Sequence, residues 1–125
     1  MSLRLLVLDD DRSLLALLRA YFAGIGWHVE ACSEAPEALR LADSDSPFDA
    51  VICDLHFTPA RLGEGFDIAS RARRRRPQSA VLLFTGDGAD VVREEARRCG
   101  VDEVVVKPAP LARLRDAALR AMKKP

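Results

Sequence analysis

The sequence has no excess of charge of either sign, few cysteines and no long apolar run. Nineteen basic residues balance nineteen acidic ones among 125 residues, so the overall charge gives no argument for binding nucleic acid or a membrane surface. No apolar stretch approaches the roughly 20 residues that span a bilayer, and the amino terminus lacks the cationic and apolar regions of a signal peptide. We therefore expect a cytoplasmic protein without direct contact to nucleic acid or membrane.

The three cysteines also exclude two kinds of scaffold. Cys32, Cys53 and Cys99 are odd in number, far apart and set in apolar surroundings. A disulfide framework or a zinc site would need cysteines in pairs at close spacing. The pattern predicts reduced, mostly buried thiols, as in a cytosolic protein.

Short apolar segments alternate with helical patterns along the whole chain. The segments expected to form strands are residues 3–8, 28–32, 50–53, 80–84 and 103–106, and the helical stretches are about 11–24, 33–42, 66–75, 90–99 and 110–122. Asp11, Ser33 and Asp90 are the candidate N-caps of the first, second and fourth helices. This alternation predicts an α/β fold with a parallel sheet and helices on both faces. The length suits one domain with one core.

Acidic residues follow two of the expected strands. Asp9 and Asp10 come directly after the first strand, and Asp54 follows the central one. The carboxyl ends of parallel strands meet at one edge of a sheet, where ligands bind in open α/β folds. Converging carboxylates need a counter-charge, and Mg²⁺ typically takes one or two carboxylates together with water and a phosphate oxygen. The plainer alternative is that Asp9 and Asp10 only favour the start of a helix.

Two further polar residues end strands in the same way. Lys107 follows three valines and precedes Pro108, a bond that can be cis, and its ammonium could reach the acidic cluster. Thr85 precedes Gly86, and its hydroxyl could donate to a phosphoryl oxygen. A lysine at a strand end is usually just solvated, and a β-branched residue there is ordinary.

These segments together resemble the receiver domain of two-component response regulators, a family of the CheY-like superfamily. The resemblance rests on four stretches in the family's order and at about its spacings: LLVLDD (5–10), VICDL (51–55), LFTG (83–86) and VVKP (105–108). It covers essentially the whole chain and implies a single receiver domain over residues 1–125. The implied fold is flavodoxin-like, a doubly wound (βα)5 arrangement with strand order 2-1-3-4-5.

The resemblance also assigns a phosphoacceptor and a metal site. Asp54 matches the residue that takes a phosphoryl group, and Asp9 and Asp10 match the acidic pair. Asp10 and Asp54 would bind Mg²⁺ directly, Asp9 largely through water, and the backbone carbonyl of His56 would be the remaining protein ligand. The implied chemistry is attack of an aspartate carboxylate on a phosphoryl group, which gives an acyl phosphate.

The remaining roles follow from the same resemblance. Thr85 matches the switch hydroxyl and Lys107 the lysine of the family pattern, while His56 and Asp87 lie where similar proteins tune the lifetime of the acyl phosphate. The implied partners are a sensor histidine kinase or phosphotransfer protein and a downstream protein bound through about residues 90–122. We expect a monomer or weak homodimer. No enzymatic activity is expected beyond self-phosphotransfer and autodephosphorylation.

The sequence departs from the family pattern at three places. Val104 stands where an aromatic residue usually pairs with the threonine, and Ala109 stands where a phenylalanine often follows Lys-Pro. After Asp54, Pro59 and Gly65 lie later than the family's proline and glycine, in a long loop expected over residues 55–65.

The arginine-rich run over residues 71–76 suggests nucleic-acid binding at first sight. However, a charge run near a helix carboxyl end is more often a solvated face that complements the helix dipole. No interleaved aromatic residues or helix-turn-helix pattern accompany the run. We therefore interpret it as a solvated helix end.

Two other functional classes stay open. A phosphorylation-independent interaction module with the same fold is favoured by Val104 and the altered loop, but disfavoured by the intact set of acids, threonine and lysine. A flavin or nucleotide enzyme of similar topology would need a phosphate-cradling loop after the first strand, where this chain carries Asp9, Asp10 and Asp11. Hydrolases that use a phosphorylated aspartate normally carry a second acid at the position of His56.

Overall fold

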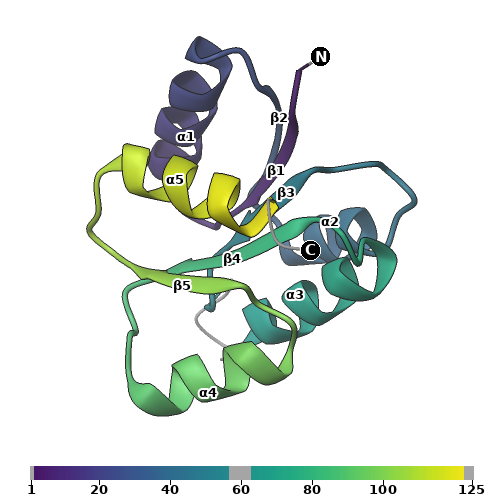
Figure 1. The fold of residues 1–125 in the computed structure, drawn as a ribbon, viewed down its shortest axis with the longest axis vertical. Helices are drawn as coiled ribbons and strands as arrows, with labels where there is room; N and C mark the ends of the chain where they lie inside the picture. The colour runs from purple at the N-terminus through teal and green to yellow at the C-terminus, as the bar shows by residue number, and fades with distance from the viewer. Residues whose placement is uncertain (1, 57–62, 123–125) are drawn as a thin grey trace.

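The computed structural model describes residues 2–56 and 63–122, in which strands and helices alternate. The order of the parallel sheet is β2-β1-β3-β4-β5, which confirms the expected flavodoxin-like fold (Figure 1). The strands are β1 (Arg4–Leu8), β2 (His28–Cys32), β3 (Ala50–Cys53), β4 (Ala80–Thr85) and β5 (Glu103–Val106). The helices are α1 (Arg12–Gly24), α2 (Ala35–Ala42), α3 (Glu64–Arg75), α4 (Asp90–Arg98) and α5 (Leu111–Met122).

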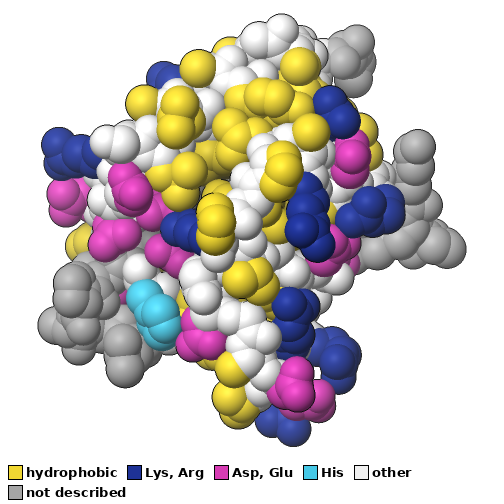
Figure 2. All heavy atoms as spheres, turned by 90° about the vertical axis from the view of Figure 1, so that its left-hand side faces the viewer, with side chains coloured by type: hydrophobic (Ala, Val, Ile, Leu, Met, Phe, Trp, Pro, Cys, Tyr) yellow, Lys and Arg dark blue, Asp and Glu magenta, His cyan; other side chains and the backbone are white. Residues whose placement is uncertain are grey.

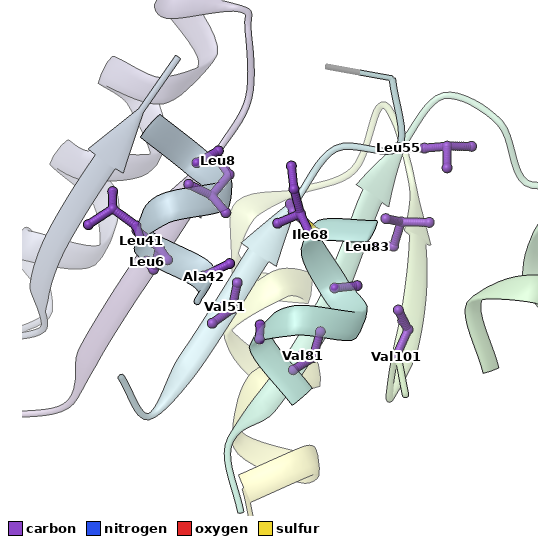
Figure 3. Packing of buried hydrophobic residues seen from close by; sticks show 14 of the residues in the cluster. Leu6, Leu8, Leu41, Ala42, Val51, Leu55, Ile68, Val81, Leu83 and Val101 are labelled. Carbon is purple, nitrogen blue, oxygen red and sulfur yellow. The ribbon is translucent and has the colours of Figure 1, made fainter. Parts of the chain in front are cut away.

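The helices cover both faces of the sheet because strand side chains alternate between the faces. On β1, Leu6 and Leu8 pack in a cluster with residues of α2, α3 and α4, whereas Leu5 and Val7 pack with residues of α1 and α5. Figure 3 shows the first cluster, where Ile68 of α3 lies over the sheet. The central strands β3 and β4 are buried along their whole length, so their carboxyl ends are held firmly.

Two of the three predicted N-caps were wrong. Asp11 caps α1, since its side chain accepts the backbone N–H of Leu14 at 3.1 Å. Glu34 rather than Ser33 is the N-cap of α2. Pro36 lies in the first turn, as predicted, where its missing N–H is not needed. Helix α4 begins at Asp90 itself, with Ala89 at the N-cap.

The arginine-rich run is not simply a solvated helix end, because two of its members point into the protein. Arg76 is buried and donates hydrogen bonds to the carbonyl oxygens of Leu41, Ala42, Ser44 and Ser46 at 2.6–3.1 Å. The carboxyl end of α2 has carbonyls without helical partners, and the planar guanidinium serves several of them at once.

Arg73 makes a second set of links. Its guanidinium lies 2.6 Å from Asp102 and donates to the carbonyls of Gly100 and Ser79 at 3.0 and 2.8 Å. It therefore connects α3 to the segments that enter β4 and β5. By contrast, Arg74 is exposed, as the sequence interpretation expects of the whole run.

The three cysteines are free thiols, as predicted. Cys32 and Cys53 are buried and Cys99 is half-buried. Burial raises the pKa of Cys53 to about 12. In the described part of the chain, every helix is too short or too polar to cross a bilayer.

Candidate functional site

Three carboxylates meet at the carboxyl edge of the sheet. Strands β1 and β3 are neighbours with Leu8 beside Cys53, so the residues that follow them, Asp9 and Asp54, lie side by side. One carboxylate oxygen from each of Asp9, Asp10 and Asp54 lies within 4.8 Å of the others. Asp9 and Asp54 are buried, whereas Asp10 is exposed.

Lys107 brings a positive charge to this cluster from the end of β5. Its backbone N–H donates to the carbonyl of Thr85 at 2.8 Å, and its peptide bond to Pro108 is cis. The ammonium Nζ lies 2.8 Å from Oδ2 of Asp9 and 3.5 Å from Oδ2 of Asp54. The structure thus brings together four of the residues that the sequence singled out.

The two buried acids differ in how their oxygens are used. Oδ1 of Asp9 accepts the N–H of Asp11 at 2.9 Å, while its Oδ2 accepts from Lys107. Both oxygens of Asp9 are therefore engaged. Asp54 meets the same ammonium at the longer distance, and its carboxylate also accepts a hydrogen bond from the backbone N–H of Leu55.

The cluster carries more negative charge than one lysine offsets. Burial, and then the charge of Asp9, raise the pKa of Asp54, although Lys107 opposes the change. Burial and Asp9 also raise the pKa of Asp10. Burial acts to lower the pKa of Lys107, but its hydrogen bond to Asp9 and the charge of Asp54 outweigh this and raise it. Uncompensated carboxylates of this kind suit a hard divalent cation with oxygen ligands.

Thr85 and His56 lie at the same edge but are not bonded to the carboxylates. The buried Oγ of Thr85 accepts the N–H of Asp87 at 3.3 Å. Nδ1 of His56 accepts the N–H of Gly63 at 3.4 Å, which holds the ring against the start of α3. The metal-binding role of the His56 carbonyl and the switch role of Thr85 stay predictions.

Gly65 supports the site in a way that sequence reasoning missed. The sequence predicts it in the loop after Asp54, but it lies in the first turn of α3, and its N–H donates to the carbonyl of Leu55 at 2.8 Å. A Cβ on Gly65 would lie 2.2 Å from the backbone oxygen of Asp54. Only glycine allows this approach, because any side chain would push α3 away from the acid. Pro59, the other departure in this loop, lies outside the described residues.

The other two departures lie on opposite faces of the sheet. Val104 is half-buried in β5 and packs against the cluster beneath α3 and α4. Ala109 packs against the cluster beneath α1 and α5. Neither position carries a ring, so the intramolecular aromatic switch of the family pattern is missing.

Comparison with known proteins agrees with this architecture. The family model for the response regulator receiver domain matches residues 5–119. The response regulator MprA of Mycolicibacterium vanbaalenii is 33% identical over 122 residues, which cover 98% of this chain and 51% of that protein. The chain spans about half or less of the length of the curated relatives it matches.

Solved structures of similar fold include two receiver proteins. A CheY-like receiver domain from Methanospirillum hungatei superposes with a TM-score of 0.86 at 21% identity, covering 98% of this chain and 94% of that one. A Burkholderia pseudomallei response regulator with a phosphorylated aspartic acid, a calcium ion and citrate gives 0.84 at 24% identity, covering 94% and 66%. With its strand order and the family match over nearly its whole length, the chain belongs to the response regulator receiver domains of two-component systems.

Proposed function

We propose that Asp54 accepts a phosphoryl group from the histidine of a sensor kinase or phosphotransfer protein, with Mg²⁺ at the acidic cluster. The observation that carries this proposal is the Lys107 ammonium, 2.8 and 3.5 Å from the two buried members of a three-carboxylate cluster. An ammonium and several carboxylates at one sheet edge can position both a cation and a phosphoryl group.

Asp54 is the best nucleophile of the three acids. Asp9 has both oxygens engaged, by Lys107 and by the Asp11 N–H, so attack through either would break a contact. Asp10 is exposed, so water would compete with its carboxylate for the phosphoryl group. Asp54 is buried at the end of the central strand, with an ammonium near one oxygen. It therefore combines shielding from water with an ammonium at 3.5 Å, a longer and weaker contact than the one that Lys107 makes with Asp9.

The transfer conserves atoms and charge. An oxygen lone pair of Asp54 forms an O–P bond as the N–P bond of the donor's phosphohistidine breaks, and the donor nitrogen keeps the electron pair and regains a proton. The Lys107 ammonium is placed to follow the phosphoryl oxygens as their charge grows. Water later hydrolyses the acyl phosphate, so the domain acts on itself and is not a turnover enzyme.

The donor set fits a magnesium ion. Asp10 and Asp54 would bind it directly, Asp9 largely through water, and the His56 carbonyl would complete the protein ligands. When bound, Mg²⁺ neutralises the carboxylates and the charge on the transferring oxygens. The phosphorylated aspartate and calcium ion named for the Burkholderia structure, at 24% identity, are properties of that protein, and they agree with this assignment.

Phosphorylation would change the surface by adding about −1.5 to −2 charges at pH 7 beside Lys107 and Thr85. Thr85 is linked to Asp87 in the loop that enters α4. A shift of Thr85 toward the new oxygens would therefore act on residues 86–90 first. We propose that a downstream protein partner reads this change through about residues 90–122, in the cytoplasm.

The test is the intact mass after incubation with Mg²⁺ and a small phosphodonor. Wild type and Asp11→Asn should gain one phosphoryl group, because Asp11 is outside the cluster, while Asp54→Asn and wild type in EDTA should not. Gain of the group by Asp54→Asn would reject Asp54 as the acceptor. No gain by wild type in the presence of a phosphorylated kinase domain would favour the alternative function, a phosphorylation-independent interaction module.

A further inference from the structure

Lys107 belongs both to the acidic cluster and to the lining of a hollow of about 530 Å³ beside the start of α1 and of α5. The other side chains around this hollow are mostly apolar, with Leu14 and Leu17 from α1 and Phe84 from β4. Figure 2 shows hydrophobic side chains gathered in the upper half of this face. The lysine side chain therefore has open space beside it, as well as the acids that it contacts.

The ammonium of Lys107 also lies over an aromatic ring. Its Nζ is 5.3 Å from the centre of the Phe84 ring. Phe84 is 3% exposed and lies in a core cluster with Leu15 and Leu114, so the core holds the ring in place. The face of an aromatic ring attracts a cation at this distance, and the attraction grows where water is excluded.

The ring and the acids hold the ammonium by different means. Asp9 and Asp54 attract it through their charges, from 2.8 and 3.5 Å. A magnesium ion at the cluster would offset much of that charge and would itself repel the ammonium. The attraction of the Phe84 ring would persist, because the ring has no net charge for a metal to offset.

Ala109 increases the importance of this contact. It lies in the same core cluster as Phe84 and lines the same hollow. A phenylalanine at position 109 would narrow the hollow, whereas the methyl group of alanine leaves space beside the ammonium. Among the described residues that line the hollow, Phe84 is the only aromatic one. It is therefore the ring on which the lysine can rest.

We propose that Phe84 is a positioning residue for phosphoryl transfer, whose ring keeps the Lys107 ammonium at the acidic cluster and out of the adjoining hollow. Phe84 acts through the lysine rather than on the phosphoryl group. The ammonium then lies in place as charge grows on the phosphoryl oxygens. This inference rests on the proposed function for the transfer itself, but the contact can be measured without it.

The kinetic test is a double-mutant cycle on the rate of phosphoryl uptake, with Mg²⁺ and a small phosphodonor. Phe84→Leu should slow uptake about two- to fivefold, the effect expected of one partly exposed cation–π contact. Lys107→Gln should also slow it. In the Lys107→Gln background, Phe84→Leu should have no further effect, because no ammonium is left to hold. An unchanged rate in Phe84→Leu alone, or equal slowing in both backgrounds as a shift of Thr85 would give, overturns the proposal.

Phe22→Leu is the matched control for the loss of a buried ring. Phe22 lies in the same core cluster as Phe84, but its neighbour is the ring of Trp27 rather than the lysine. Both variants should lose stability. At a temperature where both are folded, Phe22→Leu should keep the wild-type rate of uptake. A rate as low as that of Phe84→Leu would attribute the effect to core packing and overturn the proposal.

Nuclear magnetic resonance detects the contact without any phosphoryl transfer. Protons over the face of a ring resonate upfield, so in EDTA the ε-methylene protons of Lys107 should lie upfield in wild type and in Phe22→Leu relative to Phe84→Leu. The chain has only three lysines, so these signals are few. Most of the displacement should survive addition of Mg²⁺.

Equal positions in wild type and Phe84→Leu, or loss of the displacement with Mg²⁺, overturn the proposal. If wild type takes up no phosphoryl group, the proposed function fails, and these spectra then decide the contact on their own.

Discussion

Replacing Arg76 by alanine tests whether a buried charge joins α2 to α3. Arg76 is 7% exposed and follows directly after α3. Its guanidinium donates to two buried carbonyls, those of Leu41 and Ala42, and to the less buried Ser44 and Ser46. It also lies 5.1 Å from the ring centre of Phe48.

The expected loss follows from the acceptors left behind. A buried polar group without a partner costs about 1–3 kcal/mol. The carbonyls of Leu41 and Ala42 would be left in that state, whereas water can reach those of Ser44 and Ser46. Arg76→Ala should therefore lower the free energy of unfolding by about 2–6 kcal/mol, a large part of the roughly 5–15 kcal/mol that domains have. Arg76→Lys should recover only part, because an ammonium cannot serve the same spread of oxygens.

Urea denaturation followed by tryptophan fluorescence measures this effect. Trp27 is the only tryptophan; it is partly buried, and its ring centre lies 4.9 Å from that of the buried Phe22. The control is Arg74→Ala in the last turn of α3, where the side chain is exposed and the change should stay within about 0.5 kcal/mol. If Arg76→Ala loses no more stability than Arg74→Ala, Arg76 does not hold the two helices together.

Three further results are expected. Gly65→Ala should be strongly destabilised and slower in phosphoryl uptake, because a Cβ there would lie 2.2 Å from the backbone oxygen of Asp54. Gly24→Ala is the control: a Cβ at residue 24 has nothing within 4 Å, so stability and uptake should stay at wild-type values. Equal melting temperatures and uptake rates for the two variants would contradict this. The Cys53 thiol has a pKa of about 12, so at pH 8 it should react with a chromogenic disulfide only after denaturation. Peptide mapping identifies the labelled cysteine, and labelling of Cys53 in the native protein would refute this prediction. Burial and then Asp9 raise the pKa of Asp54, so its ionisation costs stability as pH rises through that pKa. In EDTA, Asp54→Asn should therefore melt above wild type at pH 7, and the gap should close below about pH 3, where Asp54 is mostly protonated in both folded and unfolded chains.

The strands could be predicted from the sequence because they are short, apolar and bounded by polar residues. The bounds of β2, β3 and β5 agree with the predicted ones to the residue. The meeting of Asp9, Asp54 and Lys107 was also predictable, since parallel strands place the residues that follow them at one edge. This part of the site depends on strand order alone.

The remaining contacts depend on which segments are neighbours in space. The sequence shows an arginine-rich run at the end of a helix, but not that α2 ends beside Arg76 with carbonyls to satisfy. It shows Gly65 as one more loop glycine, but not that α3 packs against the backbone of Asp54. It shows phenylalanine at position 84, but not that the Lys107 ammonium lies over its ring.

The central claim is that Asp54, and not a neighbouring acid, forms the acyl phosphate. The direct measurement is to phosphorylate wild type with Mg²⁺ and a small phosphodonor, reduce the acyl phosphate with borohydride, and map the resulting homoserine by tandem mass spectrometry. We expect homoserine at position 54 only, because both oxygens of Asp9 are engaged and Asp10 is exposed. Homoserine at position 9 or 10, or at none of the three, would contradict it.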